Sequence, residues 1–323
     1  MAPKRGSRRR ERGRTQVLDL FAGIGGFSYG FRNSNFQVIG VDADELATKT
    51  FSRNRIGHAV TMDLGKELYL RSAKIILGSP PCRPWSLVNV QRRGADHLDR
   101  RLLSRFFAHV QLIRPPLFLM ENVVPVKHDH IYVWWTNALE RDGYSLGAQI
   151  VRYSDFGAAT ARHRLLTVGV RDWDGGAGVF LALLDRKRKP AKTVRSAIAW
   201  LRDVSWEKVP DHSWGRHKTL ERYREYYRTG KYGWYRLHYD APAPSFGNVL
   251  KTYTLHPEAW VNGFVPRVVS VREVLSIMGF PKSFSFPPHA RLTSRYQAVA
   301  DAVSPAFSRA CAAAARELLG LRD

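Results

Sequence analysis

The sequence is poor in cysteine, in acidic residues and in long apolar runs. Its 323 residues include Cys82 and Cys311 as the only cysteines, so no disulfide framework is expected and an intracellular chain is predicted. It has no apolar run of the roughly eighteen residues that a membrane span requires. The N-terminus is charged and lacks an apolar core segment, which argues against a secretory signal.

The shortage of acidic residues leaves a large positive charge. Lys and Arg number 51 against 28 Asp and Glu, which gives a formal net charge of +23. This excess favours a polyanionic partner, with nucleic acid first. A membrane surface would require a basic amphipathic helix, and none is evident. An arginine-rich composition inherited from a GC-rich genome is the alternative. Residues 1–15 form a basic tail that we expect to be disordered and able to contact phosphates nonspecifically.

Short apolar segments alternate with helical patterns along much of the chain. Strands are predicted at residues 17–21, 38–41, 74–77, 117–120 and 165–170. Such continuous apolar strands suit a parallel sheet covered on both faces. The clearest helical pattern has apolar residues on one face between Leu102 and Ile113. The alternation predicts an α/β fold with a doubly wound, Rossmann-like sheet.

The alternation of apolar strands and helical patterns stops between residues 173 and 267. The segment carries basic runs and many aromatic residues, and we predict a second, smaller domain of irregular structure there. Regular patterns return at 271–278 and in an alanine-rich helix from about Pro305 to Leu319, in which Cys311 is expected to serve packing. Residues 16–172 and 268–323 are therefore predicted to form one domain, and 173–267 another.

A glycine turn, residues 19–26, follows the first predicted strand. The dinucleotide pattern G-x-G-x-x-G fails here because Ser28 occupies its last position, and no P-loop is present. For the glycines alone, a purely structural turn is an equal alternative. Asp42 ends the second strand, where a carboxylate can bind ribose hydroxyls, and Asp63 follows another probable strand end. Each acid alone is more often a helix cap or a loop residue, but their order along the chain favours a cofactor site.

A rigid loop, residues 78–86, surrounds a single cysteine with prolines. A lone cysteine is usually a small buried hydrophobe, but Cys82 follows a strand, at the edge of the sheet where doubly wound folds bind ligands. Neighbouring Arg83 would lower the thiol pKa and favour a nucleophilic thiolate. A metal site needs more ligands than one cysteine supplies, so no metal is expected.

Six segments resemble, in order, the motifs of the DNA (cytosine-5)-methyltransferases. They are residues 19–26 (DLFAGxGG), 80–86 (PPCQxFS), 121–123 (ENV), 160–164 (QxRxR), 272–281 (RE…QGFP) and 297–305 (QxGNxVxP). Any one match could be chance, but six in the family's order and spacing are not. The resemblance covers nearly the whole chain outside the tail and residues 173–267.

The resemblance implies a role for each catalytic residue type. Cys82 would add to carbon 6 of a cytosine, which makes carbon 5 reactive, and Glu121 would protonate N3. Asn122 would position the pocket, and Arg162 and Arg164 would hold the base oxygen and the surrounding site. Phosphate contact is the alternative role for the two arginines. The target atom is inaccessible within a duplex, so the base must be flipped out.

The resemblance also implies S-adenosylmethionine as cofactor and S-adenosylhomocysteine as product. Phe21 would stack on the adenine, Gly23 and Gly25 would allow close backbone approach, and Asp42 and Asp63 would bind the ribose and the adenine edge. The predicted cofactor-binding residues are Asp19, Phe21, Ala22, Gly23, Gly25, Gly26, Asp42, Ala43, Asp63, Leu64, Pro80, Asp301 and Val303.

The chain departs from the family pattern at three places. Arg83 replaces a Gln, Thr160 replaces the Gln of QxRxR, and residues 300–301 read Ala-Asp in place of Gly-Asn. None of these changes removes a catalytic group, and the last bears on how tightly the cofactor site closes. Residues 91–94 fit the family's mobile loop after the cysteine.

The resemblance implies a prokaryotic enzyme of the restriction-modification kind. We expect a monomer that is cytoplasmic and nucleoid-associated, with duplex DNA carrying a specific cytosine-containing site as partner and a cognate restriction endonuclease acting on the same site. Residues 173–267 would be the target recognition domain, with Lys and Arg for phosphates and guanine edges and aromatic residues for stacking.

Three rival functions stay open on the sequence. A tRNA methyltransferase of the same fold would carry Cys-Phe-Thr in the cysteine loop, where this chain has residues 84–86 as Pro-Trp-Ser. A catalytically silent nucleic-acid-binding paralogue is disfavoured by the intact Cys82 and Glu121. An NAD-linked oxidoreductase is disfavoured by Ser28.

Overall fold

The computed structural model describes residues 13–33, 35–82, 85, 98–205, 207–215, 220–229, 235–245 and 247–321. The expected disorder of the N-terminal tail, apart from its last three residues, lies outside this range. So do the proposed effect of Arg83 on the thiol and the loop at 91–94.

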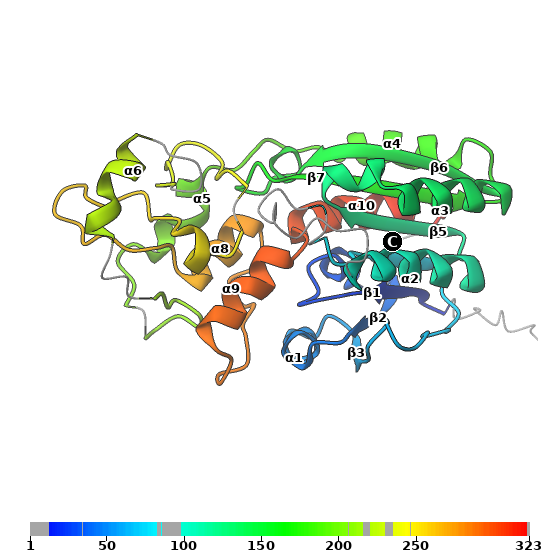
Figure 1. The fold of residues 1–323 in the computed structure, drawn as a ribbon, viewed down its shortest axis with the longest axis horizontal. Coiled ribbons are helices and arrows are strands. Elements are labelled where there is room, and N and C mark those ends of the chain that lie inside the picture. The colour runs from blue at the N-terminus through cyan, green and yellow to red at the C-terminus, as the bar shows by residue number, and fades with distance from the viewer. Residues whose placement is uncertain are drawn as a thin grey trace, which may run out of the picture.

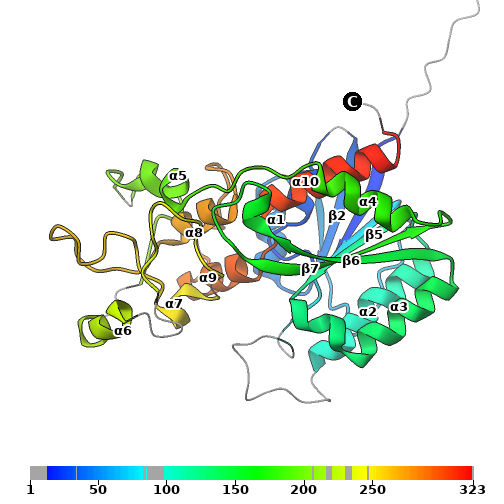
Figure 2. The same ribbon diagram turned by 90° about the horizontal axis from the view of Figure 1, so that it is seen from above.

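A seven-stranded sheet forms the body of the molecule (Figure 1), with strand order β3-β2-β1-β4-β5-β7-β6. Its strands are β1 (Thr15–Leu20), β2 (Phe36–Asp42), β3 (His58–Thr61), β4 (Ile75–Gly78), β5 (Leu117–Asn122), β6 (Tyr144–Arg152) and β7 (His163–Arg171). Helices lie on both faces (Figure 2), so the doubly wound α/β fold is confirmed.

The sheet is mixed, whereas continuous apolar strands predict a parallel one. The strand predicted at residues 165–170 is β7, and it runs antiparallel to both β5 and β6. The sequence carries no sign of this, because a strand buried on both faces is apolar whichever way it runs. Strand β6 is not predicted at all. It lies at the edge of the sheet, and polar or small residues such as Ser145, Gly147 and Gln149 interrupt its apolar pattern.

The two faces of the sheet form two hydrophobic cores. Successive residues of β1 point to opposite faces of the sheet, so Val17 lies in one core and Leu18 in the other. The first face is covered by α1 (Glu45–Arg53), α4 (Gly176–Asp185), α10 (Pro305–Leu318) and the 3₁₀ helix η1 (Ser28–Phe31). The second is covered by α2 (Leu98–Ile113) and α3 (His130–Arg141). Both α2 and α10 lie where the sequence predicts helices, and Cys311 is fully buried in α10.

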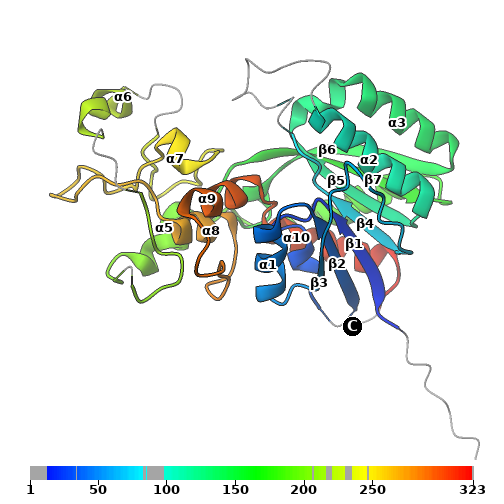
Figure 3. The same cartoon turned by 60° about the horizontal axis from the view of Figure 1, so that its bottom comes forward.

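A second lobe, residues 193–301, lies beside the sheet (Figures 1 and 3). Its helices are α5 (Val194–Ile198), α6 (Arg224–Arg228), α7 (Val249–Thr252), α8 (Val271–Met278) and α9 (Leu292–Asp301). Between α5 and α8 the described residues form short helical turns and isolated bridges, as expected for an irregular region. The guanidinium of Arg272 in α8 is buried and donates to the Pro210 and Phe284 carbonyl oxygens, which ties α8 to a loop before it and to the segment after it.

The lobe boundaries in space differ from those predicted at residues 173 and 267. Helix α4 packs on the sheet, because Ala177, Phe180 and Leu184 are buried in its first core. In the other direction, α8 and α9 lie with α5 and α7 in the second lobe (Figure 3). The chain therefore leaves the sheet only after α4 and returns to it at α10.

Candidate active site

A cavity of about 400 Å³ lies at the carboxyl ends of the parallel strands. In a doubly wound sheet the loops that follow these strands converge at one edge, where ligands bind. The cavity is lined by all five predicted catalytic residues: Cys82, Glu121, Asn122, Arg162 and Arg164. It is also lined by the predicted cofactor residues Asp19, Phe21, Ala22, Gly23, Asp42, Ala43, Asp63, Leu64, Pro80, Asp301 and Val303. Loops far apart in sequence thus build one continuous wall.

Gly25 and Gly26 are not part of the cavity wall. A Cβ on Gly25 would lie 2.4 Å from Ile56 Cδ1, and one on Gly26 would lie 2.1 Å from the Val303 carbonyl oxygen. Both glycines therefore allow close packing behind the turn. Gly23 has φ +53° and no other atom within 4 Å of the place that a Cβ would take, so it leaves open space on the cavity side.

The glycine turn is fastened by the acid that ends β2. Asp42 Oδ2 accepts the Gly23 N–H at 2.8 Å, and Asp42 Oδ1 accepts the Asp44 N–H at 2.9 Å. Burial raises the pKa of Asp42, and these backbone donors oppose that shift. Phe21 has φ 59°, an uncommon value for a residue with a side chain, and leaves β1 to line the cavity. Asp63 is more exposed and caps its own turn through the Gly65 N–H.

Asp19 is a buried acid at the base of the cavity. Burial raises its pKa to about 7, against a hydrogen bond of 2.6 Å from the Ser28 hydroxyl to Oδ2. Within the described chain, its Oδ1 has no hydrogen-bond partner, and neither has the buried Ser79 hydroxyl or the buried Nε of Arg162. All three residues line the cavity. Buried polar atoms without partners are rare in folded proteins, so this wall is suited to a polar ligand.

Hydrogen bonds position the cysteine loop from both sides. The Asn122 amide donates to the Pro80 carbonyl oxygen at 3.0 Å and accepts the Val123 N–H at 2.8 Å. Beyond the cysteine, the Trp85 indole N–H donates to the buried Asp129 carboxylate at 2.7 Å. Hydrogen bonds thus fix Pro80 on one side of Cys82 and the Trp85 side chain on the other.

Two arginines face the cysteine from β7 and the residue before it. Burial raises the pKa of the Cys82 thiol, the positive charges of Arg164 and Arg162 lower it, and the negative charge of Glu121 raises it. Among the described residues, Arg164 and Arg162 thus supply positive charge near the thiol. The two positive charges thus favour the thiolate form, whereas burial disfavours it.

Glu121 is the penultimate residue of β5 and is only 5% exposed. One of its oxygens, Oε1, accepts a hydrogen bond of 2.6 Å from the Tyr153 hydroxyl and lies 3.0 Å from Arg164 Nε. Arg162 is also buried, and its guanidinium donates to the Ala300 carbonyl oxygen, which joins β7 to the end of α9. The acid and both arginines therefore have fixed positions before any ligand binds.

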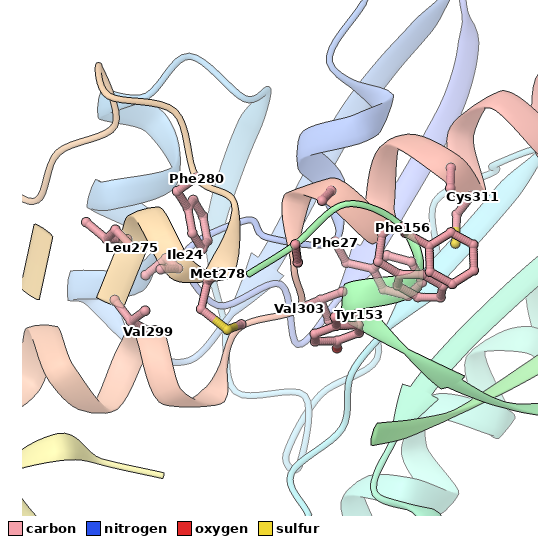
Figure 4. Close-up of a cluster of buried hydrophobic side chains, with 14 of the residues drawn as sticks. Ile24, Phe27, Tyr153, Phe156, Leu275, Met278, Phe280, Val299, Val303 and Cys311 are labelled. Carbon is pink, nitrogen blue, oxygen red and sulfur yellow. The ribbon is translucent and has the colours of Figure 1, made fainter. Parts of the chain in front are cut away.

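The segment from Asp301 to Val303 closes the cavity from the second lobe. The Gln297 side chain donates to both carboxylate oxygens of Asp301, at 3.0 and 2.9 Å. This pairing holds the Asp that departs from the family's Asn in an ordered position. Val303 lies in the apolar cluster between the glycine turn and α8 (Figure 4).

Sequence reasoning misses three residues that support the site. Tyr153 bonds Glu121, Ser28 bonds Asp19, and Asp129 bonds Trp85. Ser28 is noticed only because it breaks a dinucleotide pattern. Tyr153 carries no motif, and a tyrosine after a half-exposed strand gives no signal that its hydroxyl is buried against an acid.

Metal-binding groups and membrane-spanning helices are two further features that would bear on function. The described residues contain no group of three or more His, Cys, Asp or Glu side chains arranged to hold a metal ion. None of the helices they form has the length and apolar character needed to cross a membrane.

Comparison with known proteins gives a family match over most of the chain. The model of the family described as C-5 cytosine-specific DNA methylase matches residues 15–317. The Haemophilus parahaemolyticus type II methyltransferase M1.HphI is 27% identical over 92% of this chain and 85% of its own. The type II methyltransferase assigned as M.MJ0563P of Methanocaldococcus jannaschii is 26% identical over 92% of this chain and 97% of its own.

Solved structures share the fold. A protein described as a DNA modification methyltransferase encoded within an E. coli prophage superimposes with a TM-score of 0.72 at 22% identity, covering 95% of this chain and 99% of its own. The Entamoeba histolytica methyltransferase EhMeth superimposes with a TM-score of 0.70 at 16% identity, covering 97% of this chain and 100% of its own. At these identities the likeness concerns the arrangement of the elements.

Proposed function

The chain belongs to the C-5 cytosine-specific DNA methylase family, and from this premise we propose that it methylates carbon 5 of a cytosine flipped out of a specific site in duplex DNA. The methyl donor is S-adenosylmethionine, and Cys82 is the covalent nucleophile. The observation that carries the proposal is the gathering of Cys82, Glu121, Arg162 and Arg164 in one cavity with the glycine turn.

The cavity wall fits S-adenosylmethionine. Asp42 and Asp63 provide carboxylate oxygens for hydroxyl and amino groups, and Phe21 provides an aromatic ring for an adenine. The buried, unpartnered Asp19 Oδ1 and Ser79 hydroxyl provide polar groups for the amino-acid end. When bound, the cofactor would supply a methyl group on a positively charged sulfur.

Cys82 and Glu121 act together on the pyrimidine ring. The thiolate forms a bond from Sγ to carbon 6, the electrons of the C5–C6 double bond move toward carbon 4, and N3 takes a proton from Glu121. The ring becomes an enamine whose carbon 5 is nucleophilic. After methylation, a base removes the proton on carbon 5, the electrons of that bond form the C5–C6 double bond and expel the Cys82 thiolate, and N3 returns its proton to Glu121.

The arginines hold the base and the loop that presents it. Arg164 pairs with Glu121 and lies near the thiol, while Arg162 lines the cavity and has a buried Nε without a hydrogen-bond partner among the described residues. A carbonyl oxygen on the flipped base is the acceptor that this Nε lacks. Fixed donors at this place stabilise the charge that develops on the ring.

The proposed setting is a prokaryotic restriction-modification system. The relatives named type II methyltransferases support it. A cognate endonuclease and a cytoplasmic, nucleoid-associated monomer are further parts of this proposal. Residues 173–267, most of which lie in the second lobe and which are rich in basic and aromatic residues, are proposed to recognise the target sequence.

A methyl-transfer assay separates this function from its rivals. We expect purified protein to transfer radiolabel from S-adenosylmethionine to duplex DNA and not to tRNA, because its target is read in duplex form. Bisulfite sequencing of plasmid from expressing cells should then reveal one methylated sequence. Labelling of tRNA alone would assign the chain to the RNA branch, and binding without transfer would mark it as a silent paralogue.

Exchange of the recognition segment is expected to change the methylated site. Residues 193–267 should be replaced by those of a relative, which leaves α4 on the sheet and α8 in place. The new target should follow the inserted segment, while affinity for S-adenosylmethionine stays constant because its residues lie elsewhere. Exchange of α4, residues 176–185, is the matched control and should leave the target unchanged. An active hybrid that keeps the original target would place specificity outside the segment.

A further inference from the structure

The hydroxyl of Tyr153 lies behind Glu121, outside the cavity wall. It donates to Glu121 Oε1 at 2.6 Å, and the tyrosine is fully buried. Burial raises the pKa of its phenol well above the ordinary value, so it stays a donor at any working pH. Its ring stacks on Phe307 of α10, with centroids 5.5 Å apart, within the apolar cluster that also holds Phe156 (Figure 4). The hydroxyl is therefore fixed from behind by the core.

A hydrogen bond and an ion pair both reach the same oxygen of Glu121. Oε1 accepts from the Tyr153 hydroxyl, and Arg164 Nε lies 3.0 Å from it as an ion pair. A carboxylic acid has one carbonyl-like oxygen, which accepts well, and one hydroxyl oxygen, which donates. With Oε1 accepting from Tyr153 and lying beside the Arg164 charge, the acidic proton belongs on Oε2. Glu121 lines the cavity, so Oε2 is the oxygen free to meet N3 of a bound base.

We propose that Tyr153 is a positioning residue that directs the proton of Glu121 to Oε2, where it faces the flipped cytosine. This inference rests on the proposed function. It gives Tyr153 no contact with substrate or cofactor. When the proton passes from Oε2 to N3, Glu121 becomes an anion, and the tyrosine hydroxyl and Arg164 stabilise the negative charge that spreads onto Oε1.

The alternative is that the hydrogen bond merely satisfies a buried phenol. A comparable pair exists elsewhere in the chain: the Tyr132 hydroxyl bonds the Thr167 hydroxyl at 2.9 Å, and both residues are buried and outside the cavity wall. A structural role predicts that loss of either hydroxyl affects stability alone. A positioning role predicts an effect on catalysis for Tyr153 and none for Tyr132.

The test is the variant Tyr153→Phe, which keeps the ring and its stacking on Phe307. We expect kcat for DNA methylation to fall by about tenfold to a hundredfold, the scale of one hydrogen bond to an ionised group. The dissociation constants for S-adenosylmethionine and duplex DNA should be unchanged. Tyr132→Phe is the matched control and should keep the wild-type kcat. Thermal unfolding of both variants shows whether either loses its fold.

A second measurement separates positioning from a general loss of packing. In the Glu121→Gln background there is no acidic proton to direct, so adding Tyr153→Phe should lower the residual rate by less than about twofold. Wild-type kcat in Tyr153→Phe, or an equal loss in both backgrounds, would overturn the proposal. If wild-type protein itself transfers no methyl group to DNA, the proposed function fails first.

Discussion

DNA that carries 5-fluorocytosine at the target position is expected to stay bound to this protein through denaturation when S-adenosylmethionine is present. Cys82 lies in the cavity beside Glu121 and two arginines, where its thiolate would bond to carbon 6 of the base. Release of the methylated product requires loss of the hydrogen on carbon 5 as a proton. Fluorine cannot leave as a cation, so the covalent complex should accumulate and be seen on a denaturing gel.

Two cysteine variants make this result specific. Cys82→Ser should give no covalent complex, because a hydroxyl is a far weaker nucleophile at neutral pH, although it should still bind duplex DNA. Cys311→Ala is the control, since Cys311 is buried within the alanine-rich α10 and lies outside the cavity wall. It should form the complex as the wild type does. If wild-type protein methylates ordinary DNA but never traps the fluorinated base, covalent catalysis at carbon 5 is wrong, and transfer to the exocyclic nitrogen replaces it.

Glu121→Gln is expected to slow methyl transfer by at least about a hundredfold, the usual scale for the loss of a general acid. A glutamine oxygen still accepts from Tyr153 and still lies beside Arg164, so the local structure should persist. Its amide can contact N3 but cannot give up a proton to it. The single-turnover rate should fall while affinity for S-adenosylmethionine is retained.

The control for this variant is Glu317→Gln. Glu317 pairs with Arg186 and Lys187 on the surface of α10, away from the cavity, and its loss should leave the rate unchanged. A Glu121→Gln variant that turns over at nearly the wild-type rate would remove Glu121 from the proton-transfer step.

The sequence by itself predicted the proposed catalytic residues, which gather at the cavity, and most of the elements that carry them. Cys82, Glu121 and Asp42 each lie at or just after the end of an apolar strand, and parallel strands bring such ends to one edge. That inference needs only local pattern and chain order. The same holds for α2 and α10, whose apolar faces repeat with a helical period.

Only the tertiary structure decided which glycines face the cavity and which allow packing. Gly23 and Gly26 are equivalent in the motif, yet one borders open space and the other abuts the Val303 carbonyl. The difference depends on a segment about 280 residues further along the chain, which no local pattern encodes. The direction of β7 and the packing of α4 on the sheet were also decided only by the tertiary structure. Burial makes a segment apolar, but it does not set the direction of a strand or the surface on which a helix packs.

Tyr153 shows the physical reason most clearly. Tyr153 directly follows β6, a strand without an apolar pattern, and its ring packs on Phe307 of α10. This packing places its hydroxyl within hydrogen-bond distance of Glu121. A hydrogen bond between residues 32 positions apart depends on how three elements pack together. The sequence determined which side chains are able to react, and packing decided which partners hold them in place.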